Sequence, residues 1–202
     1  MEESTGLRER KRERTRRAIA EAALELFARQ GFHATTIPQI AEAADVSPRT
    51  VSGYFPAKED LAFPYADLQM AEFERRLQER APGETAADTL RAWIPAVVEQ
   101  GIEPPDDLRR RREVIDADEG LRARERHYML LTQAVLARAF ATDLGMDAEA
   151  LEPRMAAAAT VTVFELLGRD VAPGEPEAAL EALDRALVFI GGGIAALREP
   201  GS

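Results

Sequence analysis

Apolar residues recur along this chain at the spacing of an α-helix, and no stretch of useful length shows the strict alternation of a β-strand. After residue 80, proline and glycine interrupt the helical pattern. The interruptions fall at Pro82-Gly83, Gly101 to Pro105, Gly145, and Pro173 to Pro176. The helices expected between and before them cover residues 58–80, 84–100, 107–117, 119–144, 148–169 and 177–197. With three helices before residue 58, the pattern predicts an all-α protein of about nine helices.

Residues 35–61 read TTIPQIAEAADVSPRTVSGYFPAKEDL and contain two short helical patterns joined by a tight turn. Thr36 and Gln39 have the spacing of a capping box. Ser47 is a good N-cap, and Pro48 follows it at the first helical position. An apolar stripe follows the first cap and consists of Ile37, Ile40, Ala41 and Ala44. This arrangement is typical of a helix-turn-helix, whose second helix enters the DNA major groove, and a plain helical hairpin is the alternative.

A basic run lies directly before the first amphipathic segment. Residues 7–17 hold seven lysines and arginines against Glu9 and Glu13, a net charge of +5. A basic arm joined to a helix-turn-helix can reach phosphates or the neighbouring minor groove. The alternative is a solvated helix face. The arm residues predicted to contact DNA are Arg8, Arg10, Lys11 and Arg12.

The run from Arg17 to Leu61 resembles the DNA-binding domain of the TetR family of bacterial repressors. The segments AIAEAALELFARQGFHATTIPQIAEAADVS and RTVSGYFPAKEDL carry the resemblance. In that family, contacts to DNA come from two threonines, an aromatic residue before Phe-Pro, and the lysine that opens the fourth helix. The resemblance implies these roles for Thr36, Thr50, Tyr54 and Lys58.

Three positions depart from the common family pattern. Ser52 stands where the family often has tyrosine or phenylalanine, and Gly53 removes a side chain from the reading face. Ala57 replaces a frequent serine N-cap, whose loss costs ~1 kcal/mol if nothing else caps the helix. Arg49 therefore becomes the predicted reader of a guanine edge. Ser47, Ser52 and Gly53 complete the predicted DNA-contacting set.

The net charge of −10 is distributed unevenly. Residues 1–60 carry ten basic and ten acidic groups, so the whole acidic excess lies in residues 61–202. This asymmetry favours one docking face on DNA. The chain has no cysteine and two separated histidines, which excludes disulfides and thiolate metal sites and predicts no metal and no cofactor. No apolar run has the length of a membrane helix, and no secretory signal follows the charged N-terminus, so we expect a cytoplasmic protein.

The last two predicted helices have apolar faces suited to association. Gly191, Gly192 and Gly193 lie within the final helix, where each costs roughly 1 kcal/mol relative to alanine. Close approach of a partner helix would explain them, and a two-fold dimer would present two reading helices to one palindrome. An intramolecular core is the alternative. The predicted dimer residues are Met155, Ala159, Val163, Leu166, Leu183, Leu187, Ile190 and Ile194.

The effector site is less clearly encoded. Pro64 should kink or break the helix expected at 58–80, which makes it a candidate hinge or a harmless bend. Pro95 frees a backbone carbonyl close to Trp93, and apolar cavities with a few polar groups are typical ligand sites. The candidate pocket consists of Met70, Phe73, Arg91, Trp93, His127, Tyr128, Met129 and Phe164. Ordinary core packing is the alternative for each aromatic residue.

The run Arg109 to Arg112 is a solvated face, an anionic effector site or a DNA backbone contact. The domains expected are an arm at 1–17, a helix-turn-helix domain at 18–63, and an effector and dimerisation domain at 64–202. The function expected is that of a dimeric repressor released from a palindromic DNA operator by a small molecule. A ligand-independent regulator, controlled by a protein partner or by autoregulation, is the alternative. A helical enzyme is a third possibility, but no catalytic constellation supports it.

Overall fold

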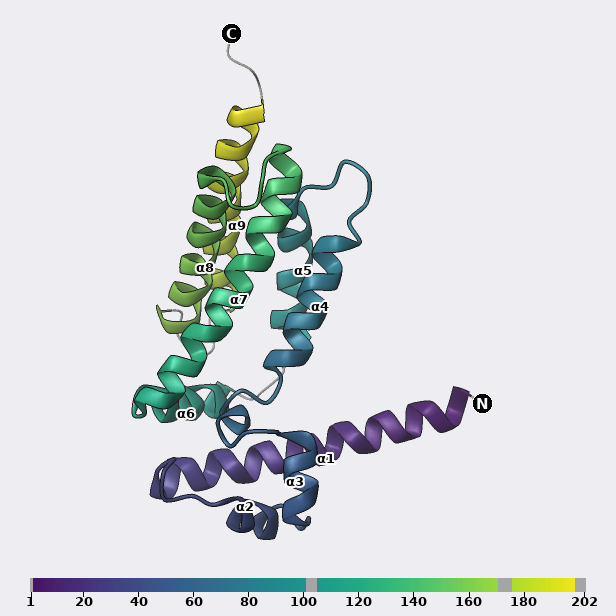
Figure 1. Ribbon diagram of the computed structural model, residues 1–202, viewed down its shortest axis with the longest axis vertical. Coiled ribbons are helices and arrows are strands. Elements are labelled where there is room, and N and C mark those ends of the chain that lie inside the picture. The colour runs from purple at the N-terminus through teal and green to yellow at the C-terminus, as the bar shows by residue number, and fades with distance from the viewer. Residues whose placement is uncertain (1, 101–104, 171–175, 199–202) are drawn as a thin grey trace. The chain divides into compact units, whose positions relative to one another are not determined.

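The computed structural model describes residues 2–100, 105–170 and 176–198. Within these residues every regular element is helical, which confirms the all-α prediction. The elements are α1 (Glu2–Gln30), α2 (Ile37–Ala43), α3 (Pro48–Tyr54), the 3-10 helix η1 (Glu59–Ala62), α4 (Ala66–Gln78), α5 (Ala86–Gln100), α6 (Pro105–Asp116), α7 (Glu119–Leu144), α8 (Leu151–Asp170) and α9 (Pro176–Arg198) (Figure 1).

The helix predicted over residues 58–80 is not continuous. Its first turn is η1, and α4 begins only at Ala66. Proline disfavours the helical conformation of the residue before it, and Phe63 indeed adopts φ −131° and ψ 58°. Pro64 therefore breaks the helix instead of kinking it. Pro95, by contrast, lies inside α5 as predicted.

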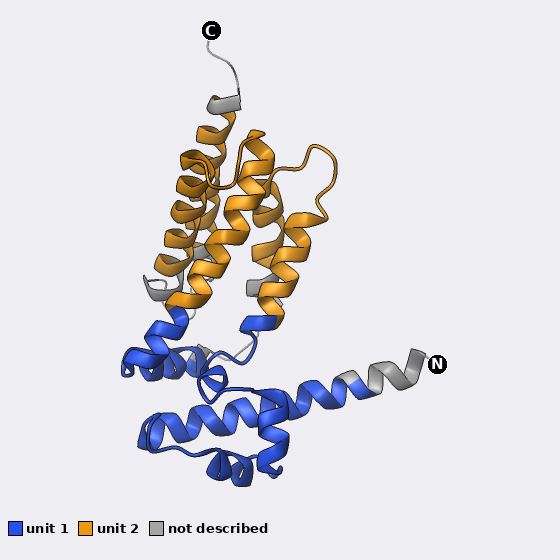
Figure 2. Cartoon of the chain, in the orientation of Figure 1, with its two compact units in different colours: residues 1–67, 106–125 blue, residues 68–105, 126–202 orange. Residues whose placement is uncertain are grey.

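The chain forms two compact units, shown in blue and orange in Figure 2. Unit 1 consists of residues 1–67 and 106–125, and unit 2 of residues 68–105 and 126–202. α6 and the first turns of α7 thus belong with the helix-turn-helix, although α6 begins about fifty residues after α3 ends. The continuous helix α7 passes from one unit into the other.

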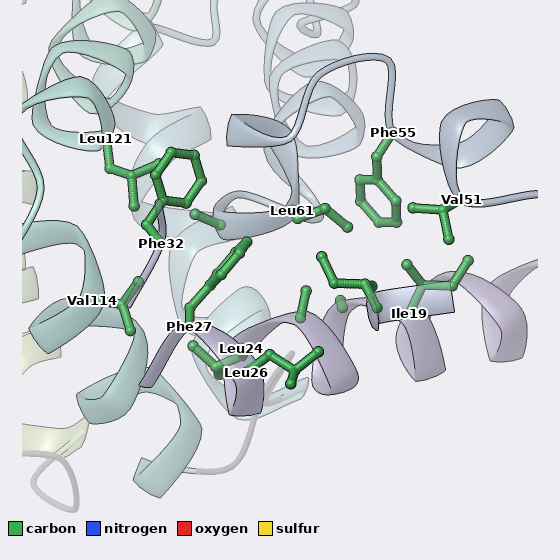
Figure 3. Packing of buried hydrophobic residues seen from close by; sticks show 14 of the residues in the cluster. Ile19, Leu24, Leu26, Phe27, Phe32, Val51, Phe55, Leu61, Val114 and Leu121 are labelled. Carbon is green, nitrogen blue, oxygen red and sulfur yellow. The ribbon is translucent and has the colours of Figure 1, made fainter. Parts of the chain in front are cut away.

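One hydrophobic core holds unit 1 together. Figure 3 shows α1 contributing Ile19 and Phe27, with Val51 of α3 and Leu61 of η1 packed against that helix. Val114 of α6 joins the same core. Because α2 and α3 have only seven residues each, they are too short to be stable alone, and their burial in this core supplies what local propensity does not.

The arginine run of α6 is occupied by contacts within unit 1. Arg111 donates to the Ala62 carbonyl oxygen at 2.9 Å, and Arg112 forms an ion pair with Glu125 at 2.6 Å. Hydrogen bonds to Asp116 and Glu125 raise the pKa of Arg112. The remaining two arginines pair with aspartates one turn earlier on the same helix. These contacts favour the reading of a solvated, ion-paired face.

Unit 2 is built around a second hydrophobic core, in which α9 packs against α8 and α5. A buried ion pair fixes the α4–α5 connection to α7: Arg80 Nη1 lies 2.7 Å from Asp143 Oδ1. The other carboxylate oxygen of Asp143 accepts the backbone N–H of Ala86 at 2.8 Å. The carboxylate therefore neutralises a buried guanidinium and also caps the start of α5.

Candidate DNA-binding site

Both helices of the helix-turn-helix begin with the predicted caps. The Thr36 backbone N–H donates to Gln39 Oε1 at 2.9 Å, and the Gln39 N–H donates back to Thr36 Oγ1 at 3.4 Å. Ser47 Oγ accepts the Thr50 N–H at 3.0 Å. Asp45 adopts φ +52° in the turn between the helices, a conformation that aspartate tolerates better than most residues. The capping pattern of the sequence is therefore confirmed in the structure.

The third helix has one buried side and one open side. Val51 is fully buried and anchors α3 to the core of unit 1. Arg49, Ser52 and Gly53 are exposed on the other side. A Cβ atom added at Gly53 would meet nothing within 4 Å, so the reading face is flat and accessible at that point. The helix thus presents the outer surface that a major-groove reader requires.

Two predicted contact residues lie at the edges of this face. Thr50 is half-buried, and its hydroxyl lies 2.8 Å from Ser47 Oγ. Tyr54, the last residue of α3, is also half-buried and packs against the unit 1 core. Thr36 is exposed at the start of α2. Their contacts with DNA remain predictions.

The basic run is helical and continuous with α1. Arg8, Arg10, Lys11 and Arg12 are all exposed on it. Positive side chains on an exposed helix that extends from a DNA-binding unit can neutralise phosphates, and binding of this kind weakens steeply with salt.

Lys58 is held by the protein itself. Its ammonium nitrogen donates to the Phe32 carbonyl oxygen at 2.9 Å and to the Thr35 carbonyl oxygen at 3.0 Å. It also lies 4.2 Å from the centre of the Phe32 ring. Two of its three N–H groups thus hold the connection between α1 and α2. The contact of Lys58 with DNA phosphate remains a prediction. The structure gives Lys58 a second role, within the protein itself.

No side chain caps the start of η1, but Asp60 of this helix binds the backbone that precedes it. Asp60 Oδ2 accepts the Ala57 N–H at 2.9 Å, and Asp60 Oδ1 accepts Arg124 Nη2 at 2.6 Å. The carboxylate therefore joins the segment just before η1 to α7 within unit 1.

Arg16 belongs to the basic run in sequence, but in the structure its side chain contacts the interior of unit 1, which the charge pattern does not predict. Arg16 Nη1 donates to the Pro64 carbonyl oxygen at 2.6 Å, and Nη2 donates to the Tyr54 carbonyl oxygen at 3.4 Å. The guanidinium also lies 4.9 Å from the centre of the Phe55 ring. The signal that could have found it is periodicity, because position 16 continues the inward stripe of Ile19 and Ala23 by about one turn.

Unit 2 brings together most of the predicted pocket residues. Phe73 is in the hydrophobic core of this unit, and its ring centre lies 5.5 Å from that of Trp93. Arg76 stacks over the Trp93 ring at 5.6 Å. The partly buried residues that pack against the same core include Met70, Trp93, Met129 and Phe164.

The polar residues of the predicted pocket are exposed, unlike its apolar residues. Arg91 is exposed and pairs with Asp184 of α9 at 2.6 Å, and His127 is exposed beside the half-buried Tyr128. A pocket of about 290 Å³ lies between α7 and the start of α8. Its lining is Leu130, Gln133, Ala134, Ala137, Arg138, Ala148, Glu149 and Arg154, none of which was predicted.

The predicted dimer residues fall into two groups. On α8, Met155, Ala159 and Leu166 are exposed, and Val163 is half-buried. On α9, however, the stripe is used by the protomer's own core. Leu183, Leu187, Ile190 and Ile194 are between 1% and 7% exposed.

The α9 prediction therefore needs correction. A strongly apolar helix face is also the one whose burial in the protomer's own core is most favourable. The neighbouring face of α9 exposes Val188 and Phe189 instead. Gly192 and Gly193 lie on exposed positions beside them, and an added Cβ would meet nothing within 4 Å at either.

Within the described part of the chain, no group of three or more histidine, cysteine, aspartate and glutamate side chains is placed to hold a metal ion. Among the described helices none is long and apolar enough to cross a membrane.

Comparison with known proteins agrees with this site. Residues 19–63 match the family described as "Bacterial regulatory proteins, tetR family". The HTH-type transcriptional regulator TcmR of Streptomyces glaucescens is 33% identical over 175 residues, covering 82% of this chain and 75% of that protein. The regulator RutR of Escherichia coli K12 is 47% identical over 58 residues, which cover 29% of this chain and 27% of the RutR chain.

Solved structures share the fold over most of the chain. GusR of Salmonella enterica superposes with a TM-score of 0.60 at 23% identity, covering 90% of this chain and 95% of that one. A SmeT–triclosan complex gives a TM-score of 0.57 at 22% identity, covering 90% of both chains. FadR of Thermus thermophilus, a TetR-family repressor in complex with lauroyl-CoA, gives 0.56 at 22% identity, covering 88% of this chain and 94% of that one.

A capped helix-turn-helix with an exposed second helix is the arrangement found in many DNA-binding proteins. The family match and the similarity to TcmR over most of both chains identify the family within this class. The chain belongs to the TetR family of bacterial transcriptional regulators.

Proposed function

We propose that the protein is a dimeric repressor that binds a two-fold symmetric operator and is released from it by a small apolar effector. The observation that carries the DNA-binding part is the outer face of α3. Its exposed residues Arg49, Ser52 and Gly53 project from a helix fixed by the Ser47 cap and by the buried Val51. A rigid helix with one exposed guanidinium is suited to a bidentate contact with guanine.

In this proposal Arg49 reads sequence, and the exposed cations of α1 neutralise phosphates. Base contacts give specificity, whereas phosphate contacts set register and overall affinity. Thr36, Thr50 and Tyr54 are proposed to contribute contacts to the DNA backbone. Lys58 acts first as a clamp on the α1–α2 connection.

The dimer forms through the exposed face of α8 and the exposed face of α9. On α8 the residues Met155, Ala159, Thr162 and Leu166 repeat at helical spacing, and all are exposed in the single chain. On α9 the side chain of Phe189 is 82% exposed, which is unusual for a large aromatic residue of a solitary helix face. Phe189 therefore replaces the core residues of α9 in the proposed interface.

The glycines support the same assignment. Gly192 and Gly193 follow Phe189 and leave the α9 backbone open. A partner helix can approach such a backbone closely, which offsets the conformational cost of glycine in a helix. A second copy of the chain satisfies this geometry and also the two-fold symmetry of a palindromic operator.

The effector is proposed to bind near the aromatic residues of unit 2. Phe73 and Trp93 form a tilted pair, and Met70, Met129 and Phe164 pack around the same core. Flexible methionines together with aromatic rings favour an apolar ligand. Two proteins with this fold, SmeT and FadR, have been solved in complex with triclosan and lauroyl-CoA, ligands that both carry large apolar parts.

One experiment tests the function as a whole. The purified protein is used to select DNA from a random-sequence pool, and the selected fragments are sequenced. Recovery of a two-fold symmetric site supports the proposal, and recovery without any common sequence contradicts it. Release of the selected site is then measured with a panel of apolar compounds, and Trp93 fluorescence reports their binding. Tight, specific DNA binding that no compound weakens would favour control by a protein partner or by autoregulation.

A further inference from the structure

The guanidinium of Arg16 connects three separate segments of unit 1. It donates to the last residue of α3 through the Tyr54 carbonyl and to the Pro64 carbonyl beyond η1. It also stacks against Phe55, which is buried. Arg16 itself belongs to α1, so one side chain joins the first helix to both sides of the segment that follows α3.

These contacts meet a specific need of α3. A helix leaves its last four carbonyls without partners in the helix, and a helix of seven residues has few other groups to hold its end. A cation at a helix C-terminus is also favoured by the helix dipole. Ser47 holds the first turn of α3 and Val51 holds its middle. Arg16 supplies the third point of attachment.

The charge of Arg16 is thus directed into the protein. Its neighbours along the arm differ: Arg12 and Arg17 are exposed, and Arg17 forms an ion pair with Glu21 one turn away on the same helix. Hydrogen bonds from a guanidinium to two carbonyls are charge-assisted and geometrically selective, because the planar fork fixes both acceptors relative to each other.

We propose that Arg16 is a positioning residue for sequence recognition: it sets the orientation of the C-terminal end of α3 and does not contact DNA phosphate. This inference rests on the proposed DNA-reading role of α3. The proposal also gives Arg16 a different role from the other residues of the basic run, although the sequence alone does not distinguish Arg16 from them.

The full-length variants Arg16→Gln and Arg17→Gln provide the test, because they remove the same charge from adjacent positions. Affinity for the selected operator and for a random duplex is measured over a range of KCl concentrations. We expect Arg16→Gln to lower operator affinity about tenfold, since it removes charge-assisted hydrogen bonds, with a much smaller loss on random DNA. The slope of log affinity against log salt should stay unchanged. Arg17→Gln should leave the ratio between the two duplexes unchanged.

A phosphate contact would behave differently. Loss of one such contact reduces the salt slope by about 0.9 and weakens both duplexes alike. That outcome for Arg16→Gln would overturn the proposal, and so would unaltered operator affinity. Arg12→Gln serves as a reference for a residue on the exposed part of the arm.

Hydrogen exchange gives a readout that does not depend on DNA. In the free protein, Arg16→Gln should accelerate amide exchange in the peptide spanning residues 48–55 relative to wild type and Arg17→Gln. If the wild-type protein bound no duplex selectively, the proposed function would fail, yet this measurement would still decide whether Arg16 holds α3. Should Arg16→Gln not fold, Arg16→Lys keeps the charge but cannot reproduce the fork. Arg16→Lys should then lose part of the preference for the operator over random DNA. Full wild-type preference in this variant would overturn the proposal.

Discussion

The ammonium group of Lys58 lies 2.9 Å from the backbone carbonyl oxygen of Phe32 and 4.2 Å from the centre of the same residue's ring. One residue therefore receives both a charge-assisted hydrogen bond and a cation–π contact from a single cation. Because Phe32 lies in the connection between α1 and α2, this contact fixes where the helix-turn-helix starts.

Replacement of Lys58 by methionine should destabilise the protein by about 1–3 kcal/mol, since two backbone carbonyls lose a charged donor. Chemical unfolding monitored by circular dichroism measures this loss. Exposed Lys11, replaced in the same way, is the control and should unfold like wild type. Unchanged unfolding of Lys58→Met, together with a salt slope lower by about 0.9, would make Lys58 a phosphate contact alone.

Arg49→Ala should weaken the selected operator much more than random DNA, by about 1–3 kcal/mol, because a bidentate contact with guanine is lost. Arg29→Ala removes an equal charge from an exposed position at the end of α1 and should affect both duplexes equally. Binding titrations on the two duplexes give the ratio. An equal loss on both for Arg49→Ala would remove it as a base reader.

Phe189→Glu should give a folded monomer, because it places a charge in the centre of the proposed α8–α9 interface without disturbing the protomer's core. Leu187→Glu, two residues earlier, should unfold the chain, since Leu187 is 1% exposed. Leu130→Glu changes another exposed apolar residue, on α7, and should remain dimeric. Sedimentation velocity and circular dichroism separate the three results. A stable dimer of Phe189→Glu would exclude that face of α9 from the interface.

Asp143→Ala should destabilise the protein by about 3–5 kcal/mol, because it leaves the buried guanidinium of Arg80 without a counter-charge. The exposed pair between Arg138 and Glu74 is the matched control, and Glu74→Ala should cost at most about 1 kcal/mol. Urea unfolding of both variants provides the comparison. Similar midpoints for the two would show that the buried pair is not structurally important.

Hydrogen bonds from Arg75 and Arg76 lower the pKa of Glu72 from 4.5 to about 2. A carboxylate whose pKa is depressed in the folded state stabilises that state above its unfolded pKa, and loses this contribution as pH falls through the folded value. We therefore expect the contribution of Glu72 to disappear between about pH 4.5 and 2. Glu72→Gln should show a shallower loss of stability over this range than wild type does. Identical acid profiles for Glu72→Gln and wild type would contradict the assignment.

Much of the DNA-binding half could be predicted from the chain because its signals are local. The Thr36–Gln39 box and the Ser47 cap involve residues three positions apart, so their geometry follows from the helix start itself. Helical periodicity gave nearly all helices within a few residues. Pro64 was recognised as a disruption, although the sequence did not distinguish a kink from a complete break.

Which apolar face turns inward, and where each charge goes, was decided only by the tertiary structure. Two faces of α9 are apolar, and local spacing cannot say that the core takes Leu187 while Phe189 stays exposed. Arg16 and Arg17 are identical residues in one basic run, yet one holds α3 and the other pairs with its own helix. Periodicity and capping depend on neighbours within about one turn, whereas burial and charge pairing depend on residues far away in sequence that only the folded core brings together.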